Sequence, residues 1–422
     1  MKSFFSSLRC FACGHELPAG APDYVCPACG GNLEVHYDWP ANHPDRSWWR
    51  DTTRRDIFRY FSLLPVSDLS LASPLRVGNT PLYSAPRLAA AAGLSSLYIK
   101  DDGQNPSASF KDRAGAIALV RARETGASVI CGASTGNAGS SMACLAASVG
   151  FPCVIFVPQA APAAKIAQLL TFGARVIAVR GTYDDAFDLC MHVCAQRGWF
   201  NRNTGYNPYT REGKKTAAFE LFEQLGRIPD WVAVPVGDGN IISGIWKGFR
   251  DLFDAGISDR LPHLLCCQSE ASDAITRGVA AARALGLSAT SAPADWQQLA
   301  VPAVAATTVA DSISVDIPRD GLAAVRAVIE SEGAAIVVPD ADILATIPLV
   351  ARATGVFPEP AAATAAAGLL AAAKSAILPS DALAVILSTG NGLKDIASAR
   401  KAAGEPLVID NSTDAAMRAT EL

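Results

Sequence analysis

Short apolar runs alternate with helix-length segments through the middle of this chain, and this alternation restricts the fold more than any other feature. It predicts strands at 128–131, 153–157 and 175–179, which alternate with helices at 137–149, 162–172 and 183–197. Further buried strands are predicted at 96–100, 231–236, 263–270 and 383–389. Strands that are apolar throughout and separated by helices are typical of a parallel sheet with crossover helices. We therefore expect an α/β fold with two lobes.

The length of the chain, 422 residues, allows more than one domain with a core of its own. The expected parts are a cysteine-rich segment at 1–36, a connector at 37–74, a large lobe at 75–112 and 204–400, a small lobe at 113–203 and a tail at 401–422.

Composition and charge exclude several classes of protein. Half of the residues are hydrophobic and 18% are charged, which is typical of a globular chain rather than a disordered one. The formal charge of −4, without a basic block, argues against nucleic acid or a membrane surface as the partner. The longest apolar stretch, 360–373, is rich in alanine and too short for a bilayer, so it predicts a buried helix. The first ten residues lack the apolar core of a signal peptide, and the expected location is the cytoplasm.

Four of the eleven cysteines form two matched pairs near the start of the chain. Cys10, Cys13, Cys26 and Cys29 follow the spacing C-x2-C-x12-C-x2-C, with a glycine after each pair. Four thiolates at this spacing suit a tetrahedral Zn²⁺ in a zinc ribbon, whereas disulfides are rare in a reducing compartment. Because sulfur fills all four positions, the expected zinc ion is structural. The later cysteines, such as Cys131, are interpreted as small core residues.

The segment "NPSASFKDRAG", residues 105–115, places Lys111 after a turn signal and at the start of an Ala-rich helix. A structural lysine is more often found on a polar helix face, with its charge in water. A lysine at this position could instead be an amine that forms an imine with a carbonyl cofactor. The segment alone leaves both interpretations open.

Three further segments place a loop of small residues between a predicted strand and a helix, where ligands collect in such folds. In "CGASTGNAGSSMA", 131–143, Ser134, Thr135 and Asn137 could hold a carboxylate, although an ordinary capped turn is the simpler interpretation. In "VPVGDGNIISG", 234–244, two glycines precede a helix whose N-terminus favours a phosphate, although such turns are common. In "LSTGNGLKD", 387–395, a hydroxyl of Ser388 or Thr389 could face the nitrogen of an aromatic ring. Together with Lys111, these segments are what pyridoxal phosphate requires.

The motifs resemble those of the fold-type II (tryptophan synthase β-like) pyridoxal-phosphate enzymes, and among them the threonine synthases. The segments "GNTPLY", "NPSASFKDRAG", "ASTGNAGSS", "NPYTREGKKTAAFE", "GVFPEPAAATAAAGL" and "STGNGLKD" occur in the order of that family, and the N-terminal ribbon is similar to one that many threonine synthases carry. The resemblance covers about residues 8–396. It implies an enzyme with two α/β lobes, the larger of which binds the cofactor.

The resemblance also implies a role for individual residues. Lys111 corresponds to the catalytic Schiff-base lysine, and Ser134, Thr135 and Ala138 to the residues that hold the substrate carboxylate. The implied cofactor-binding residues are Phe110, Asn137, Gly237, Asp238, Gly239, Asn240, Ile241 and Thr389.

The chain departs from the family pattern in two places. Ser107-Ala108-Ser109 replaces the usual Thr-Gly-Ser before Phe-Lys. Many threonine synthases have an arginine two residues before the glutamate of "EGKKT" that binds the phosphate of O-phosphohomoserine, and here Thr210 stands there. A shift of one residue redirects a side chain, so Arg211 does not simply replace it. We predict that Arg211 or Lys214 has taken over the role; Arg202 and Lys215 are further sources of positive charge.

The leading functional hypothesis is a threonine synthase, which converts O-phospho-L-homoserine and water to L-threonine and phosphate. The alternative keeps the cofactor but makes the chain a β-eliminating or β-replacing amino-acid lyase, such as a serine/threonine dehydratase or a cysteate-synthase-like enzyme. A homologue without catalytic activity is a third hypothesis, and the retention of Lys111 with the three loops argues against it. The expected partners are a small anionic amino acid and a second copy of the chain in a homodimer.

Overall fold

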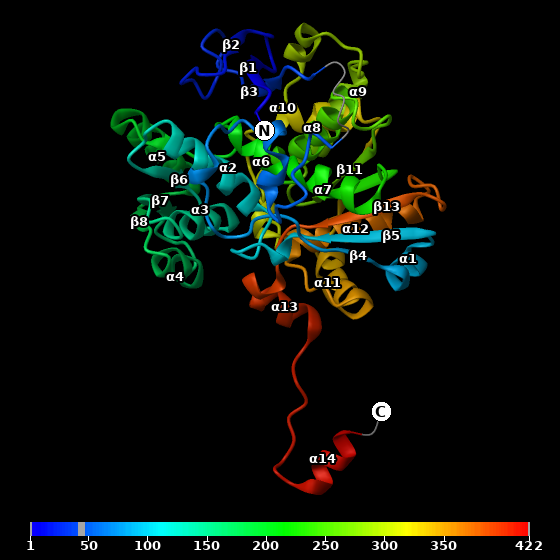
Figure 1. Ribbon diagram of the computed structural model, residues 1–422. Helices are drawn as coiled ribbons and strands as arrows, with labels where there is room; N and C mark the ends of the chain where they lie inside the picture. The colour runs from blue at the N-terminus through cyan, green and yellow to red at the C-terminus, as the bar shows by residue number, and fades with distance from the viewer. Residues whose placement is uncertain (1, 41–46, 421–422) are drawn as a thin grey trace.

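Three β-sheets organise the computed structural model, which describes residues 2–40 and 47–420 (Figure 1). The largest sheet has six strands in the order β12-β11-β10-β13-β5-β4. Their bounds are β4 Leu82–Ser84, β5 Ser96–Asp101, β10 Trp231–Pro235, β11 His263–Ser269, β12 Ala334–Val338 and β13 Leu383–Ser388. All neighbouring strands in this sheet are parallel except β4 and β5.

A second sheet has four parallel strands in the order β8-β7-β6-β9. Its strands are β6 Ile130–Ala133, β7 Cys153–Pro158, β8 Arg175–Val179 and β9 Phe200–Asn201. The helices between these strands are α3 Asn137–Ala147, α4 Ala163–Thr171 and α5 Tyr183–Arg197. The small sheet and its helices lie on the left of Figure 1, beside the large sheet.

Helices cover both faces of the large sheet because its strands are apolar on both sides. Val232 and Val234 pack in one core cluster with Phe249, while Ala233 between them packs in another with Leu369. The helices outside the small sheet are α1 Pro86–Ala92, α2 Lys111–Glu124, α6 Tyr209–Lys214, α7 Thr216–Leu225, α8 Asn240–Asp254, α9 Ala274–Ala284, α10 Gly321–Glu330, α11 Asp340–Thr354, α12 Pro360–Lys374, α13 Ile396–Ala403 and α14 Thr413–Ala419. Short 3₁₀ helices lie at Ile57–Leu63, Leu69–Leu71, Asp102–Gln104, Pro293–Gln298, Asp311–Ile313 and Gly392–Lys394.

The third sheet is antiparallel and belongs to the N-terminal ribbon, residues 2–37 of the described chain. Its strands are β1 Phe5–Cys10, β2 Glu16–Pro18 and β3 Leu33–Tyr37, in the order β2-β1-β3. The ribbon is fixed to the body by side-chain hydrogen bonds. Asn32 Nδ2 donates to the carbonyl oxygen of Arg319 at 2.8 Å, and the Tyr37 hydroxyl donates to Glu212 at 2.5 Å. At the other end, α14 extends away from the rest of the molecule (Figure 1).

The predicted strands and helices are confirmed to within about two residues. The strand expected at 128–131 is β6, which begins two residues later, and the apolar stretch at 360–373 forms the buried helix α12. β12 and the two-residue β9 were not predicted, since β9 is too short to leave a periodic pattern. Residue 1, residues 41–46 of the predicted connector and residues 421–422 of the predicted tail lie outside the described residues.

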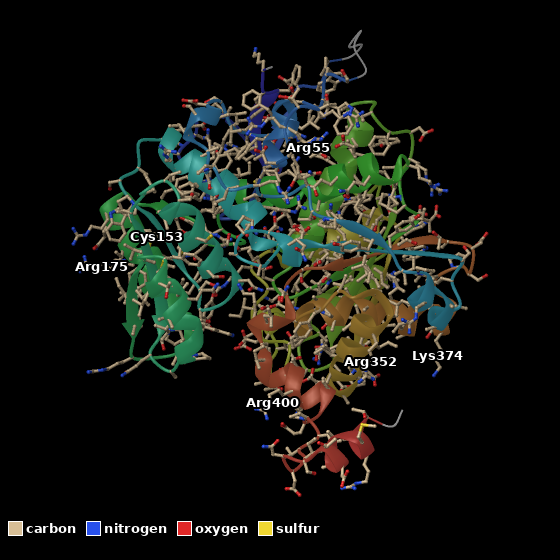
Figure 2. All side chains as sticks on the ribbon, turned by 60° about the horizontal axis from the view of Figure 1, so that its bottom comes forward. Arg55, Cys153, Arg175, Arg352, Lys374 and Arg400 are labelled. Carbon is tan, nitrogen blue, oxygen red and sulfur yellow. The ribbon has the colours of Figure 1, made fainter. Side chains whose placement is uncertain are left out.

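Several charged side chains project from the surface, whereas the later cysteines are buried. Arg175, Arg352 and Lys374 project outward in the side-chain view (Figure 2). Cys131 and Cys153 are buried, as expected for small core residues. None of the described helices combines the length and the apolar character that a bilayer crossing requires.

Candidate active site

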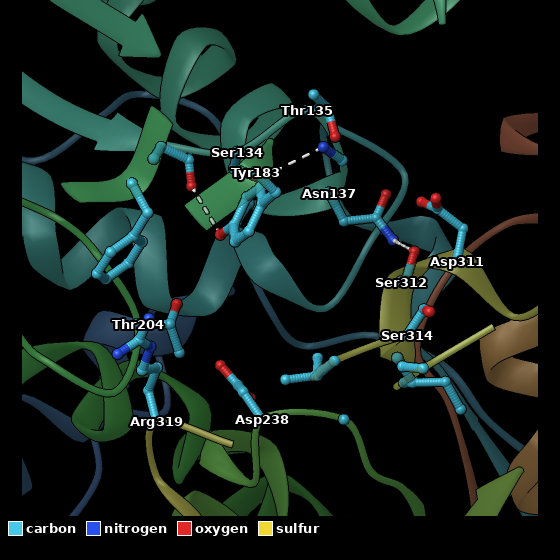
Figure 3. Close-up of a pocket in the computed structure, with 18 of the residues that line it drawn as sticks. Ser134, Thr135, Asn137, Tyr183, Thr204, Asp238, Asp311, Ser312, Ser314 and Arg319 are labelled. Atoms are coloured by element: carbon cyan, nitrogen blue, oxygen red, sulfur yellow. Dashed lines mark hydrogen bonds between the residues drawn. The ribbon is translucent and has the colours of Figure 1, made fainter. Parts of the chain in front are cut away.

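A cavity of about 600 Å³ lies between the two larger sheets, at the carboxyl ends of their strands. Its walls are formed by the segments that follow β6, β7, β8, β9 and β10, together with residues 311–319. In Figure 3, Ser134 and Asn137, from the segment between β6 and α3, and Asp238, from the loop after β10, approach the same space. Parallel strands that end together bring distant loops to one place, and ligands bind there in open α/β sheets.

Lys111 is the first residue of α2 and lines this cavity, which confirms that it lies at the mouth of a helix. Burial lowers the pKa of its amine, and the carboxylate of Asp238 raises it in part. The preceding Phe110 donates its backbone N–H to the carbonyl oxygen of Thr389 at 2.8 Å. This bond holds the start of α2 against the end of β13. A lowered pKa makes a lysine amine easier to deprotonate, and the neutral amine is a nucleophile and a proton acceptor.

Ala108 is a position at which the chain departs from the family pattern but keeps an unusual backbone conformation. It has φ 62, in the left-handed region that favours glycine, which is the residue of the usual family pattern at this position. The backbone of Ala108 is fixed on both sides, because its N–H donates to Asn105 at 2.8 Å and its carbonyl oxygen accepts from Asn391 at 3.1 Å. The turn therefore keeps its shape although this conformation is sterically unfavourable for alanine.

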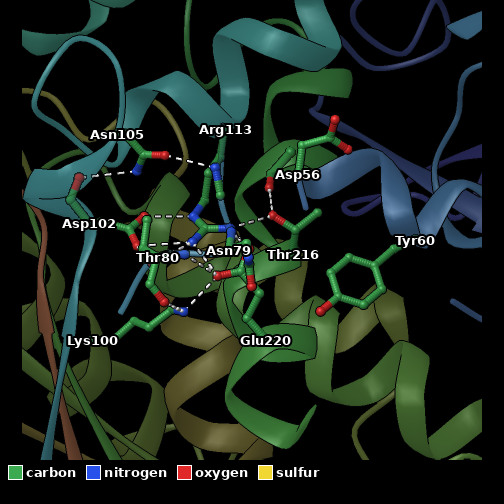
Figure 4. Close-up of polar contacts among 12 residues, drawn as sticks. Asp56, Tyr60, Asn79, Thr80, Lys100, Asp102, Asn105, Arg113, Thr216 and Glu220 are labelled. Atoms are coloured by element: carbon green, nitrogen blue, oxygen red, sulfur yellow. Dashed lines mark hydrogen bonds and ion pairs between the residues drawn. The ribbon is translucent and has the colours of Figure 1, made fainter. Parts of the chain in front are cut away.

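A buried ion network fixes the other side of α2 (Figure 4). Arg113 donates through Nε and Nη2 to Asp102 at 2.6 and 2.9 Å, and through Nη1 and Nη2 to Glu220 at 2.6 and 2.8 Å. Lys100 also pairs with Glu220, at 2.6 Å. Because every charge in this network has a partner, it sets the position of the helix that begins with Lys111.

The predicted carboxylate loop lies in the cavity wall, since Ser134, Thr135, Asn137 and Ala138 all line it. Asn137 begins α3, whose first turn presents unpaired backbone N–H groups to an anion. The Asn137 side chain donates to Glu359 Oε1 at 2.8 Å and to Ser312 at 3.3 Å.

The predicted phosphate loop connects β10 to α8, and Gly237, Asp238, Gly239 and Ile241 line the cavity. Gly239 has φ 95, and a Cβ there would lie 2.6 Å from the Cβ of Ala324. Asp238 accepts the backbone N–H of Asn240 at 3.0 Å. Burial would raise the pKa of Asp238, but the positive charges of Lys111 and Lys214 lower it overall. The glycine therefore allows the loop to turn closely over α10, with the amides at the start of α8 near the cavity.

Five of the predicted residues with cofactor or substrate roles do not line the cavity: Phe110, Asn240, Thr389, Arg211 and Lys214. Phe110 and Thr389 meet through their backbones, as described above, and Thr389 is 6% exposed. Arg211 pairs with Asp320 and donates through Nε to Ser243 at 3.2 Å. Lys214 donates to the side chain of Asn240, which is buried as well. Burial and the nearby charge of Lys111 hold the pKa of Lys214 well below its usual range.

The four ribbon cysteines come together as the spacing predicts. Their sulfur atoms all lie within 4.8 Å of one another, and the Cys10–Cys29, Cys13–Cys26 and Cys13–Cys29 separations are 3.5, 3.6 and 3.4 Å. Ligands at a Zn–S distance of about 2.3 Å around a tetrahedral ion lie at about 3.8 Å from one another. The cluster is therefore compatible with a zinc ribbon.

Sequence reasoning missed the role of Glu359 and of the segment 311–319. Glu359 belongs to the motif "GVFPEPAAATAAAGL", which offered a signal, whereas Ser312 and Arg319 stand in no recognisable motif. Burial raises the pKa of the Glu359 carboxyl to about 7. Glu359 is therefore a titratable group next to Asn137 whose charge changes near neutral pH.

Two buried hydroxyl groups test whether the site fits pyridoxal phosphate. Ser109 Oγ and Ser388 Oγ, from the residues that directly precede Phe110 and Thr389, have no hydrogen-bond partner among the described residues. Buried hydroxyls are normally paired, so an additional polar group fits this region. With the amine of Lys111 in the cavity and two helix N-termini in its wall, the residues present fit a ring that carries a carbonyl group and a phosphate.

The chain matches one protein family and is similar in sequence to threonine synthases from several organisms. Residues 74–390 match the family described as pyridoxal-phosphate dependent enzyme. The chain is 36% identical over 406 residues to the threonine synthase of Methanocaldococcus jannaschii, covering 95% of this chain and 96% of that protein. It is 36% identical over 346 residues to the threonine synthase of Mycobacterium leprae, covering 82% and 90%.

Solved structures with low sequence identity share the fold. Threonine deaminase isoform 2 from Solanum lycopersicum superposes with a TM-score of 0.66 at 20% identity, covering 87% of this chain and 96% of that one. Maize serine racemase superposes with a TM-score of 0.61 at 21% identity, covering 74% and 89%.

Proposed function

The chain belongs to the pyridoxal-phosphate dependent enzymes and, among them, to the threonine synthase family, and we propose that it converts O-phospho-L-homoserine and water to L-threonine and phosphate. The observation that carries this proposal is the combination of similarity over nearly the whole chain with the cavity that Lys111 and three motif loops line together. The reaction class is that of a carbon–oxygen lyase acting on a phosphate ester.

In this proposal Lys111 is the catalytic residue. It holds the cofactor through its amine and moves protons between the substrate carbons, for which its lowered pKa suits it. Pyridoxal phosphate supplies, when bound, an electron sink for negative charge that develops next to the substrate's amino group. Residues from four segments are proposed to hold the cofactor: Phe110, Asn137, Gly237, Asp238, Gly239, Asn240, Ile241 and Thr389.

Ser134, Thr135 and Ala138 are proposed to hold the substrate carboxylate at the N-terminus of α3. This position uses the unpaired N–H groups of the first helical turn, and the partial positive charge there favours an anion. Both lobes contribute residues to the cavity wall, so a bound substrate would contact both of them.

One observation keeps a second candidate function in view. Thr210 stands where many threonine synthases have their phosphate-binding arginine, and neither Arg211 nor Lys214 lines the cavity. The alternative is a β-eliminating or β-replacing amino-acid lyase of the serine/threonine dehydratase or cysteate-synthase-like kind.

A substrate panel separates the two candidates. The purified holoenzyme would be supplied with O-phosphohomoserine, serine, threonine, O-phosphoserine and O-acetylserine, and the products identified. Release of phosphate and threonine from O-phosphohomoserine alone supports the proposed function. Brisk turnover of a neutral amino acid without reaction of O-phosphohomoserine contradicts it and supports the alternative.

We also propose a structural zinc ion at Cys10, Cys13, Cys26 and Cys29, a homodimeric assembly and a cytoplasmic location. The division into lobes at residues 113 and 203 remains a proposal that limited proteolysis can test.

A further inference from the structure

Arg202 is a buried arginine in the wall of the cavity whose guanidinium is only partly satisfied. It directly follows β9, and its backbone N–H extends the ladder to Cys131 at 2.8 Å, which fixes its place at the end of the small sheet. The residue is 3% exposed. Its Nη1 donates to Thr204 Oγ1 at 3.0 Å, while Nε and Nη2 have no hydrogen-bond partner among the described residues.

The two unpartnered atoms lie on one edge of the guanidinium, the edge that binds a carboxylate or phosphate in a bidentate manner. Two other arginines of this protein use the same edge. Arg113 places Nε and Nη2 on Asp102, and Arg54 places them on Asp56 at 3.0 and 2.8 Å. Arg202 is buried like Arg113, yet its edge meets no carboxylate within hydrogen-bonding distance in the described chain.

Arg202 does not lose its charge by deprotonation at neutral pH. Burial lowers the pKa of its guanidinium to about 10, so it remains charged at neutral pH. The carboxylate of Asp238 is the strongest favourable charge near it, but that carboxylate accepts the N–H of Asn240. A buried cation without a hydrogen-bonded anion is unfavourable, and a ligand anion would relieve that cost.

Arg202 lies in the wall of the same cavity as the proposed catalytic lysine. Both Arg202 and Lys111 line it, and the charge of Arg202 contributes to the lowered pKa of Lys111. Thr204, which also lines the cavity, adds a hydroxyl beside Nη1. Arg211, by contrast, has its guanidinium occupied by Asp320 and Ser243 behind the wall.

We propose that Arg202 binds the phosphate group of the substrate with the edge of its guanidinium that carries Nε and Nη2. This requires the side chain to move toward the cavity that it lines, because protein atoms enclose Nε and Nη2 in this structure. This inference rests on the proposed function, since it names the residue that recognises a phosphorylated side chain in a chain with Thr210 at the usual arginine position. The ligand class is an amino acid whose side chain ends in a phosphate ester, and the released product, inorganic phosphate, fits the same subsite.

The test uses holoenzyme with Arg202→Gln and Arg202→Lys, and with Arg175→Gln as a control on an exposed arginine of the same sheet (Figure 2). Two charge-assisted hydrogen bonds to a phosphate are lost in Arg202→Gln, so its kcat/KM for O-phosphohomoserine should fall by about 100-fold or more. The inhibition constant for inorganic phosphate should rise by a similar factor. Arg202→Lys should recover part of both, and Arg175→Gln should match the wild type.

Thermal unfolding separates binding from a structural role. Without phosphate, Arg202→Gln should be at least as stable as the wild type, because it removes a buried charge that lacks a partner. Added inorganic phosphate should raise the melting temperature of wild-type holoenzyme and of Arg175→Gln, but not of Arg202→Gln. A lower melting temperature of Arg202→Gln, with an unchanged response to phosphate, would mean that Arg202 is structural and would overturn the inference.

Failure of the inference and failure of the proposed function give different results. If wild-type enzyme turns over O-phosphohomoserine and Arg202→Gln keeps its kcat/KM and phosphate inhibition, the inference is wrong and the function stands. If wild-type enzyme leaves O-phosphohomoserine unchanged, the proposed function is wrong. In that case stabilisation by phosphate that depends on Arg202 still supports the subsite, and its absence overturns it.

Discussion

Nδ2 of Asn137 donates a 2.8 Å hydrogen bond to Oε1 of Glu359, which stands 222 residues later in the chain. The bond joins the first turn of α3 beside the small sheet to the start of α12 beside the large one. It also places a carboxyl group with a pKa of about 7 next to a proposed cofactor-binding residue. The two lobes therefore meet at a group whose charge changes near neutral pH.

Glu359→Gln should become more stable than the wild type as the pH rises. Burial raises the pKa of Glu359 from 4.5 to about 7 in the folded chain, so the folded state holds the proton more tightly than the unfolded state. The wild type loses stability between pH 4.5 and pH 7, and a shift of this size corresponds to about 3 kcal/mol. Chemical denaturation of cofactor-free protein at pH 5 and pH 8 measures the gap between the two proteins. An equal gap at both pH values would show that Glu359 titrates normally.

Lys111→Ala should lose turnover and the visible absorption of bound cofactor. The alanine removes the amine that holds the cofactor, but it also removes a charge that burial disfavours, so the variant should remain folded. Absorption spectra and product assays check this, with Lys374→Ala as an exposed control. Wild-type activity in Lys111→Ala would rule out the assignment.

Gly239→Ala should weaken the binding of pyridoxal phosphate, and Gly226→Ala should not. Both glycines have positive φ, 95 and 69, so both substitutions introduce backbone strain of about 1 kcal/mol. At Gly239 the added Cβ also meets Ala324 at 2.6 Å, whereas nothing lies within 4 Å at Gly226. Displacement of the loop moves the backbone amides at the start of α8. Cofactor titration of the two apoproteins measures the difference, and equal affinities would place the cofactor phosphate elsewhere.

Ala108→Gly should stabilise the protein by up to about 1 kcal/mol, because alanine occupies a left-handed conformation there. Ala376, with φ 55, is a matched position at the end of α12, and Ala376→Gly should give a similar gain away from the site. Denaturant midpoints compare the three proteins. A loss of stability at position 108 alone would indicate that the methyl group makes contacts that outweigh the strain.

The ribbon cysteines should bind one zinc ion per chain. Cys13→Ser should lose the metal and lower the stability of the protein, while Cys153→Ser changes a buried cysteine outside the ribbon and should keep the metal. Metal analysis of freshly purified protein and thermal unfolding with and without a chelator are the measurements. Purified wild type without zinc, in buffer free of chelator, would contradict the proposal.

Local features could be predicted from the sequence. Features that depend on contacts between distant segments could not. The strands at 153–157 and 175–179 are apolar runs bounded by turn residues, so their positions could be read directly. Lys111 and the loops after β6 and β10 carry recognisable motifs. The importance of Glu359 and Arg202 depends instead on which groups surround them after folding. Arg211 shows the same limit, since its sequence position suggested a substrate contact and its observed partner is Asp320.

The attachment of the ribbon to the body has a consequence for how the chain folds during synthesis. The ribbon is synthesised before the body, but Asn32 cannot form its hydrogen bond until Arg319, 287 residues later, has been synthesised. At roughly 5–20 residues per second, that interval is roughly 15 to 60 seconds. During it the four thiols lie on a short segment whose contact with Arg319 cannot yet form. The proposed zinc ion would therefore have this interval in which to bind, before the ribbon makes its contact with the completed body.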